Sequence, residues 1–131
     1  MVDQGYSLTR TTLSRAICLE LLSQSPLARV VISVRCLPAA LPARIAVIGD
    51  DHLLVASSEG SVILAAKRHD VISVQVDGLE AGGVIWSVMA SGLASPAKDI
   101  EDLPHEMRAS LDLGATLISL PLAVVVGQRI G

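Results

Sequence analysis

The chain has 131 residues, of which 51% are hydrophobic and 18% are charged, and its formal net charge is −3 at pH 7. This hydrophobicity excludes a disordered chain, and the scattering of its ten basic residues excludes the basic patch of a nucleic-acid-binding protein. Phenylalanine is absent and Tyr6 and Trp86 are the only aromatic residues, so we expect an aliphatic core.

The composition also predicts a compartment and an assembly. The apolar runs are far shorter than the roughly 20 residues that span a bilayer, and residues 1–12 lack the apolar centre of a signal peptide. Cys18 and Cys36 are expected to be reduced, as in cytosolic proteins. We therefore predict a cytoplasmic protein without a membrane or nucleic-acid partner. Because a small domain this rich in aliphatic residues leaves some of them uncovered, we also predict a homodimer.

A loose N-terminal segment (residues 1–10) is predicted to precede a single domain (residues 11–131). Thr11 or Thr12 is the expected N-cap of a first helix, because a threonine hydroxyl accepts a hydrogen bond from a free N–H in the first turn. This helix is expected to end before Pro26, since the residue before a proline disfavours helical geometry.

Strands dominate the rest of the chain. Alternating β-branched residues predict a strand over residues 27–35, followed by a loop and a hairpin that turns at residues 49–51. The later predicted elements are a short helix at 59–68, a strand at 70–77, a strand at 84–94 with Gly92 as a bulge, a helix between 95 and 114, and a last strand from about Leu120. Hairpin-length links between strands favour an antiparallel sheet or barrel over a parallel fold.

Side chains that would form a catalytic or metal centre are scarce. His52, His69 and His105 fall in three different elements, without cysteines or carboxylates at metal-ligand spacing, so no metal site is predicted. The sequence has no nucleophile elbow, Cys-x-x-Cys pair, Walker loop or dinucleotide fingerprint. Any chemistry must therefore come from a bound cofactor.

The stretch SSEGS (residues 57–61) joins a predicted strand to a predicted helix. Hydroxyl groups, a glycine and a helix start at such a junction are typical of a phosphate site, because N–H groups at a helix N-terminus attract anions. The same residues also fit an ordinary serine cap. The residues alone leave both interpretations open.

The order of several short segments resembles the pyridoxamine 5′-phosphate oxidase-like family of FMN-binding split barrels, which has many small actinobacterial members. The resemblance covers about residues 13–129, and the segments that carry it are LARVVISV, PARIAVIGDDHLLVAS, SSEGS, RHDVISVQVDG, IWSVMASGLA and PLAVVVGQRI. It implies a mainly β, α+β fold: a six-stranded antiparallel split β-barrel with short flanking helices. It also implies a homodimer with two flavin sites along the subunit groove, each built from both subunits.

The resemblance assigns candidate cofactor-binding residues. In the family, the strand before the turn commonly ends in Arg followed by Thr or Ser, and here Ala56 and Ser57 occupy those positions. The turn then supplies Ser58, Gly60 and Ser61, which match the small and hydroxyl residues of the family pattern. The hydroxyl groups and the glycine are therefore kept.

The expected phosphate-binding cations are missing. Val62 stands where the family has a lysine, and Glu59 in the same turn would repel a phosphate. Losing two cations weakens phosphate binding by on the order of 10² to 10⁴-fold. Arg44 is the best substitute cation if its side chain faces the groove, and Lys67 is a more distant one. Trp86 matches a residue near the family's cofactor groove.

Three functions follow from the resemblance. The first is an FMN-dependent oxidoreductase that acts on an unidentified small molecule. The second is a degenerate split barrel that has lost flavin phosphate binding and serves as a non-catalytic ligand-binding or interaction module. The third, a reductase that uses the deazaflavin F420, is less well supported because the polyglutamate tail of that cofactor needs a basic groove, whereas this chain is acidic.

Overall fold

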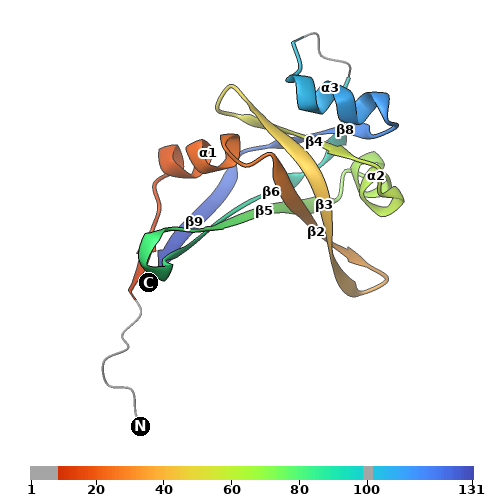
Figure 1. Ribbon diagram of the computed structural model, residues 1–131. Helices are drawn as coiled ribbons and strands as arrows, with labels where there is room; N and C mark the ends of the chain where they lie inside the picture. Colours follow the sequence, from red (N-terminus) through yellow and green to blue (C-terminus); the bar gives the residue numbers. More distant parts are fainter. Residues whose placement is uncertain (1–8, 99–101) are drawn as a thin grey trace.

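The computed structural model describes residues 9–98 and 102–131. Residues 1–8, which make up most of the predicted loose terminus, lie outside the described residues. One antiparallel sheet curls on itself, and three short helices lie against it (Figure 1). The strands are β1 (Arg10–Thr12), β2 (Leu27–Val34), β3 (Leu37–Ile48), β4 (His52–Ser57), β5 (Val71–Leu79), β6 (Ile85–Leu93), β7 (Ser95–Pro96), β8 (Thr116–Pro121) and β9 (Val124–Ile130). The helices are α1 (Arg15–Ser23), α2 (Gly60–Lys67) and α3 (His105–Asp112), with a 3-10 turn, η1 (Ala81–Gly83), between β5 and β6.

The sheet forms a split β-barrel with the strand order β1-β9-β6-β5-β2-β3-β4-β8-β7. Strands β6 and β8, which are not neighbours in the sheet, come close where Gly92 faces Pro121. A Cβ atom at Gly92 would lie 3.0 Å from the carbonyl oxygen of Pro121. The predicted bulge at Gly92 is therefore wrong: the β5–β6 register continues through Ile72 and Gly92, and the glycine instead permits this close approach.

The predicted mainly β fold with short helices is confirmed, but the count of six strands is wrong, because the described residues form nine. The predicted last strand is in fact two strands, β8 and β9. The chain turns after Pro121, and the backbone N–H of Leu122 donates to the carbonyl of Asp51 at 2.8 Å. The other additions are the short strands β1 and β7, which pair with β9 and β8.

The first helix begins later than predicted. Thr11 and Thr12 lie in β1, and Ser14 is the N-cap of α1, its Oγ accepting a hydrogen bond from the Ile17 N–H at 3.3 Å. Leu13 is buried and donates its backbone N–H to Gly127. The chain therefore runs in an extended conformation beside β9 as far as Leu13, and α1 begins after this residue.

Strand β3 is longer than expected, because it takes in the residues predicted as a loop. It begins at Leu37 and includes Pro38 and Pro42. Both prolines pair only with β2, since the pairing of β3 with β4 starts at Arg44. Proline is tolerated there because the other edge of the strand has no ladder partner that needs its missing N–H.

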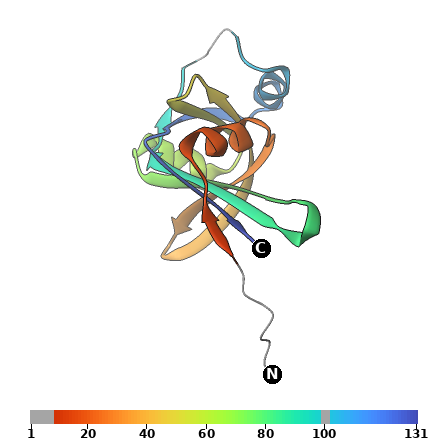
Figure 2. The same cartoon turned by 90° about the vertical axis from the view of Figure 1, so that its left-hand side faces the viewer.

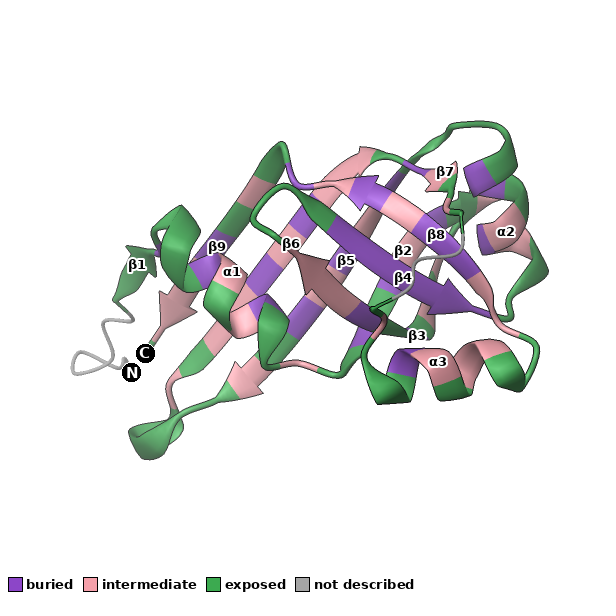
Figure 3. Ribbon diagram, turned by 90° about the horizontal axis from the view of Figure 1, so that it is seen from above, coloured by how far each residue is buried: buried purple, intermediate pink, exposed green. Residues whose placement is uncertain are grey.

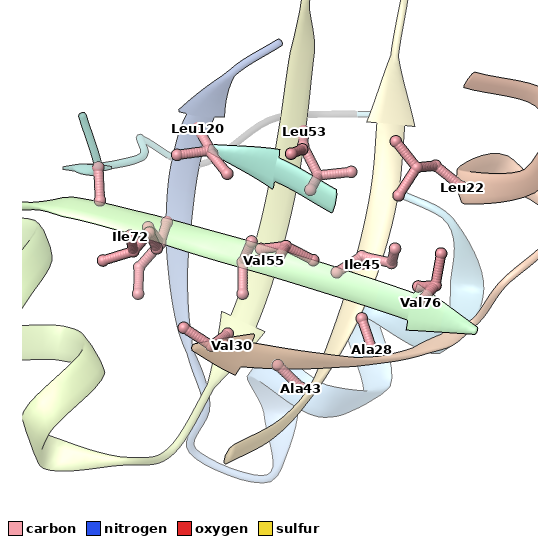
Figure 4. Close-up of a cluster of buried hydrophobic side chains, with 14 of the residues drawn as sticks. Leu22, Ala28, Val30, Ala43, Ile45, Leu53, Val55, Ile72, Val76 and Leu120 are labelled. Atoms are coloured by element: carbon pink, nitrogen blue, oxygen red, sulfur yellow. The ribbon is translucent and has the colours of Figure 1, made fainter. Parts of the chain in front are cut away.

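The predicted aliphatic core is confirmed and fills the inside of the curled sheet. Val30, Leu53, Val55, Ile72 and Leu120 converge there from four strands (Figure 4). Helices α1 and α2 add residues to this interior cluster, and Figure 3 shows the buried positions concentrated along the central strands.

Helix α3 covers the opposite face of β4 and β8. Met107 of α3 packs with Leu54, Ala56 and Leu117 in a second, smaller cluster. Figure 2 shows α3 set apart from α1 on the outside of the barrel. Strand β4 is consequently buried on both faces, and only its first residue, His52, is exposed.

The two cysteines should differ in reactivity. Cys36 is exposed, whereas Cys18 is 1% exposed, and burial raises the pKa of the Cys18 thiol while the nearby Arg15 acts in the opposite direction. Because the thiolate is the reactive form, iodoacetamide is expected to add one label to the native protein and two in urea, as measured by intact mass. Equal labelling rates at both positions in the native protein would contradict the placement of Cys18.

Candidate functional site

The junction between β4 and α2 has the shape expected of a phosphate site but uses one hydroxyl internally. Ser57 is the last residue of β4 and is 2% exposed. Its Oγ accepts a hydrogen bond from the backbone N–H of Glu59 at 3.1 Å. Glu59 occupies the N-cap position of α2, and Gly60 begins the helix. The Ser57 hydroxyl therefore stabilises the turn, and the Ser58 hydroxyl is the one left for a ligand.

This junction opens onto a cavity of about 570 Å³, here called the first cavity. Its polar lining consists of Arg44, Ser57, Ser58, Glu59 and Ser110. Its apolar lining includes prolines and leucines that are exposed to solvent. They are Pro26, Leu27, Pro42 and Leu113.

Arg44 reaches this cavity from β3, where it pairs with Leu27 of β2 and Ala56 of β4. Its neighbours Ala43 and Ile45 point into the barrel interior, so the alternation of the strand turns Arg44 outward. Arg44 is exposed, and its guanidinium has no hydrogen bond or ion pair with any residue in the described part of the chain. It is thus a free cation in a cavity with an apolar wall.

The remaining candidates lie elsewhere. Ser61 follows Gly60 in the first turn of α2, but Val62 is 0% exposed and belongs to the interior cluster. Position 62, where the family has a lysine, therefore faces the barrel interior and not the first cavity. The reason is that α2 packs this side against the interior cluster. Lys67 is the last residue of α2, which puts it about 10 Å from Gly60 at 1.5 Å per residue.

Trp86 lies on β6, outside the lining of the first cavity. Its indole covers Gly78 of β5, where any Cβ atom would collide with the ring. The cross-strand neighbour of Trp86 on β9 is Arg129, which forms an ion pair with Glu80. Within one chain, Arg44 and Trp86 therefore belong to different parts of the molecule.

Side chains that could bind a metal ion are scattered over the described part of the chain. No three His, Cys, Asp or Glu side chains among them gather as metal ligands. His52 contacts Asp51 at 3.2 Å in the β3–β4 turn, away from the first cavity. No described helix is long and apolar enough to cross a membrane.

Comparison with known proteins places the chain in a family. Residues 14–116 match the family model of pyridoxamine 5′-phosphate oxidase. The chain belongs to this family. The resemblance read from the order of segments is thus confirmed. No protein with a curated function matches the chain in sequence.

Several solved structures share the fold. An FAD-binding protein from Mesorhizobium loti has a TM-score of 0.75 at 21% identity, covering 95% of this chain and 99% of that chain. The FAD-binding protein from Mycobacterium smegmatis has a TM-score of 0.69 at 21% identity, covering 92% and 98%. The FAD and heme binding protein from the same organism has a TM-score of 0.66 at 16% identity, covering 90% and 71%. At these identities the likeness shows the fold alone.

Sequence reasoning missed the part of the site that α3 supplies. Ser110 and Leu113 line the first cavity because α3 folds back over β4, more than fifty residues away in sequence. A weak indication that Leu113 lines a binding surface was present in the sequence, because it is an apolar residue just after an amphipathic helix. Its 88% exposure in the structure shows that no described core residue covers it.

The buried position of Val62 gives a direct test. Val62→Lys is expected to lower the free energy of unfolding by about 3 kcal/mol or more, because it buries an ammonium group without a partner. Leu64→Lys, on the exposed face of the same helix (45% exposed), is expected to stay within about 1 kcal/mol of the wild type. Urea unfolding followed by circular dichroism measures both. An unchanged midpoint for Val62→Lys would mean that position 62 faces the cavity after all.

Proposed function

We propose that this protein binds a flavin nucleotide in the first cavity and uses it in the oxidation or reduction of a small molecule. The observation that carries the proposal is Arg44, whose guanidinium has no partner among the described residues and faces a cavity at the strand-to-helix junction of a pyridoxamine 5′-phosphate oxidase family member. The names of the flavin-binding proteins that share the fold support the same class of cofactor.

The residues of the cavity fit a flavin nucleotide in kind. Arg44 offers a charge-assisted hydrogen bond to a phosphate, and Ser58 and the first N–H groups of α2 add neutral donors. Leu27 and Pro42 provide an apolar surface for a planar ring. Because the described lining of the first cavity has one cation, the site is predicted to hold the phosphate weakly compared with relatives that keep the Arg and Lys of the family pattern.

A bound flavin would supply hydride or electron transfer, and the chain itself would bind and orient it. FMN was the cofactor expected from the sequence, and it remains the reference ligand for the tests below. F420 gains no support from the site, since Arg44 is the only cation among the described residues that line the first cavity. The degenerate barrel without a flavin remains the competing hypothesis, and the buried Val62 and the apolar Ala56 favour it.

We also propose that two copies of the chain pair through the outer face of β2, β5, β6 and β9. Helices α1 and α2 contribute to the interior and α3 covers β4, so this face lacks a covering helix in the described chain. Val124 and Val126 of β9 are 55% and 61% exposed there. Beside them, the hydroxyl groups of Ser73 and Ser91 form a 2.7 Å hydrogen bond across β5 and β6. A mixed apolar and hydroxyl surface of this kind suits a self-complementary interface.

Removing the cation should weaken flavin nucleotide binding. Arg44→Gln is expected to reduce affinity for FMN by about 10 to 100-fold, the equivalent of one charge-assisted hydrogen bond, and to leave affinity for riboflavin unchanged because riboflavin has no phosphate. Flavin fluorescence titration measures both ligands. Arg68→Gln, at the far end of α2, is the matched control. Wild-type protein that binds neither riboflavin nor a flavin nucleotide would overturn the proposed function.

The pairing surface should respond to a charge. Val126→Glu is expected to convert a dimer to a monomer, because a twofold interface would bury two carboxylates without partners. Leu64→Glu on the surface of α2 is the control and should remain dimeric. Sedimentation velocity reports the mass of each. A wild-type monomer, or a Val126→Glu dimer as tight as the wild type, would contradict the proposed interface.

A further inference from the structure

Helix α3 is attached to the barrel by little apolar surface. Among the described residues of this helix Met107 alone is buried, at 2% exposure. It packs with Leu54, Ala56 and Leu117 in the small cluster, which is separate from the interior cluster of the barrel. Figure 3 shows the other residues of α3 as exposed or intermediate. Because apolar burial is the main source of stability, α3 is held to the barrel more weakly than the strands are held to one another.

The two ends of α3 are fixed to different degrees. At its C-terminal end, the N–H of Gly114 donates to the carbonyl of Leu111 at 3.0 Å, and the N–H of Ala115 donates to the carbonyl of Ser110 at 3.0 Å. These bonds form a Schellman motif, and Gly114 has the positive φ (+99°) that the motif requires. At the N-terminal end, Pro104 is the N-cap residue and offers no side-chain acceptor to the free N–H groups of the first turn. The N-terminal end of α3 is therefore the looser one.

Helix α3 forms part of the wall of two cavities. Ser110 and Leu113, at and just after its C-terminal end, line the first cavity. Glu106 and Met107, in its first turn, line a second cavity of about 520 Å³, and Arg44 of β3 lines both. Because Met107 also belongs to the small cluster, the contact that holds α3 down is at the same time a boundary of the second cavity. Lifting the helix would therefore open the two cavities to each other.

We propose that α3 is a lid that opens separately from the barrel, with Gly114 as its pivot, and that its opening joins the two cavities into one cleft around Arg44. Figure 2 shows α3 on the outside of the barrel, where such a movement leaves the interior cluster intact. Leu113, 88% exposed beside the first cavity, is placed to contact a ligand under the closed lid. The opening itself does not depend on the proposed function, and only the effect of a bound flavin on the lid rests on it.

Two adjacent residues of β4 provide a matched test. Leu54 is 2% exposed and lies under α3, whereas Leu53 is 0% exposed and faces the barrel interior. Leu54→Cys and Leu53→Cys are each combined with Cys36→Ser, which removes the exposed thiol. Labelling by iodoacetamide, located by peptide mass spectrometry, is expected to be about tenfold or more faster at position 54, because lid opening exposes it without unfolding of the barrel.

The dependence of labelling on urea does not rely on how far each variant is destabilised. Lid opening exposes only the small cluster, so the labelling rate at position 54 is expected to change less than about threefold below the unfolding transition. The rate at position 53 should rise about tenfold or more over the same range, because only unfolding of the barrel exposes it. Equal rates with equal urea dependence would overturn the proposal, since α3 would then separate only when the whole barrel unfolds.

A variant that fails to fold, as judged by circular dichroism, is replaced by a measurement on the wild type. Native-state hydrogen exchange in urea then compares the amides of α3 with those of β5, whose Val74 is 0% exposed in the interior cluster. Exchange of the α3 amides that is faster and less dependent on urea supports the lid. Exchange with the same free energy and the same urea dependence in both elements overturns it.

FMN serves as the probe of the closed lid. At about 100 times its dissociation constant, FMN is expected to slow labelling at position 54 by about tenfold or more, because a ligand that binds only under the closed lid disfavours opening. Binding of FMN without this slowing would overturn the lid as a cover of the flavin site. Absence of FMN binding would instead overturn the proposed function, and the labelling of the ligand-free protein would still decide whether α3 opens.

Discussion

The burial of β4 on both faces is the constraint on which the site depends. One face carries Leu53 and Val55 into the barrel interior, and the other carries Leu54 and Ala56 against Met107 of α3. A strand covered on both sides can expose polar groups only at its ends. The strand end at Ser57 is therefore where the chain opens a cavity, and the same packing brings α3 over that cavity. The binding surface is a consequence of how the apolar residues are covered.

At the β4–α2 junction, the geometry of the proposed phosphate site is present without the lysine of the family pattern. The strand, the serine turn and the helix start are all present, because they are held by backbone packing and by the hydrogen bond from Glu59 to Ser57. The lysine position is instead occupied by Val62, whose side chain stabilises the interior. A valine suits this buried position better than a lysine would, because burying an unpaired ammonium group costs free energy.

In the proposed flavin site, Arg44 of β3 supplies the cation that the turn after β4 lacks. Its position opposite Ala56 places it beside the residue where the family pattern has an arginine. Arg44 thus lies one strand away from the position of the arginine in the family pattern. Arg44 borders two cavities at this place.

The sequence by itself determined the aliphatic core, the mainly β class and most strands, because period-two alternation and turn residues are local signals that survive in a single chain. It also identified the serine turn and the missing lysine. Only the tertiary structure decided that residues 116–130 form two strands, that Val62 faces inward, and that Arg44 and Ser110 share a cavity. Those outcomes depend on strand register and on α3 folding over β4, contacts between residues far apart in the chain that no local pattern encodes.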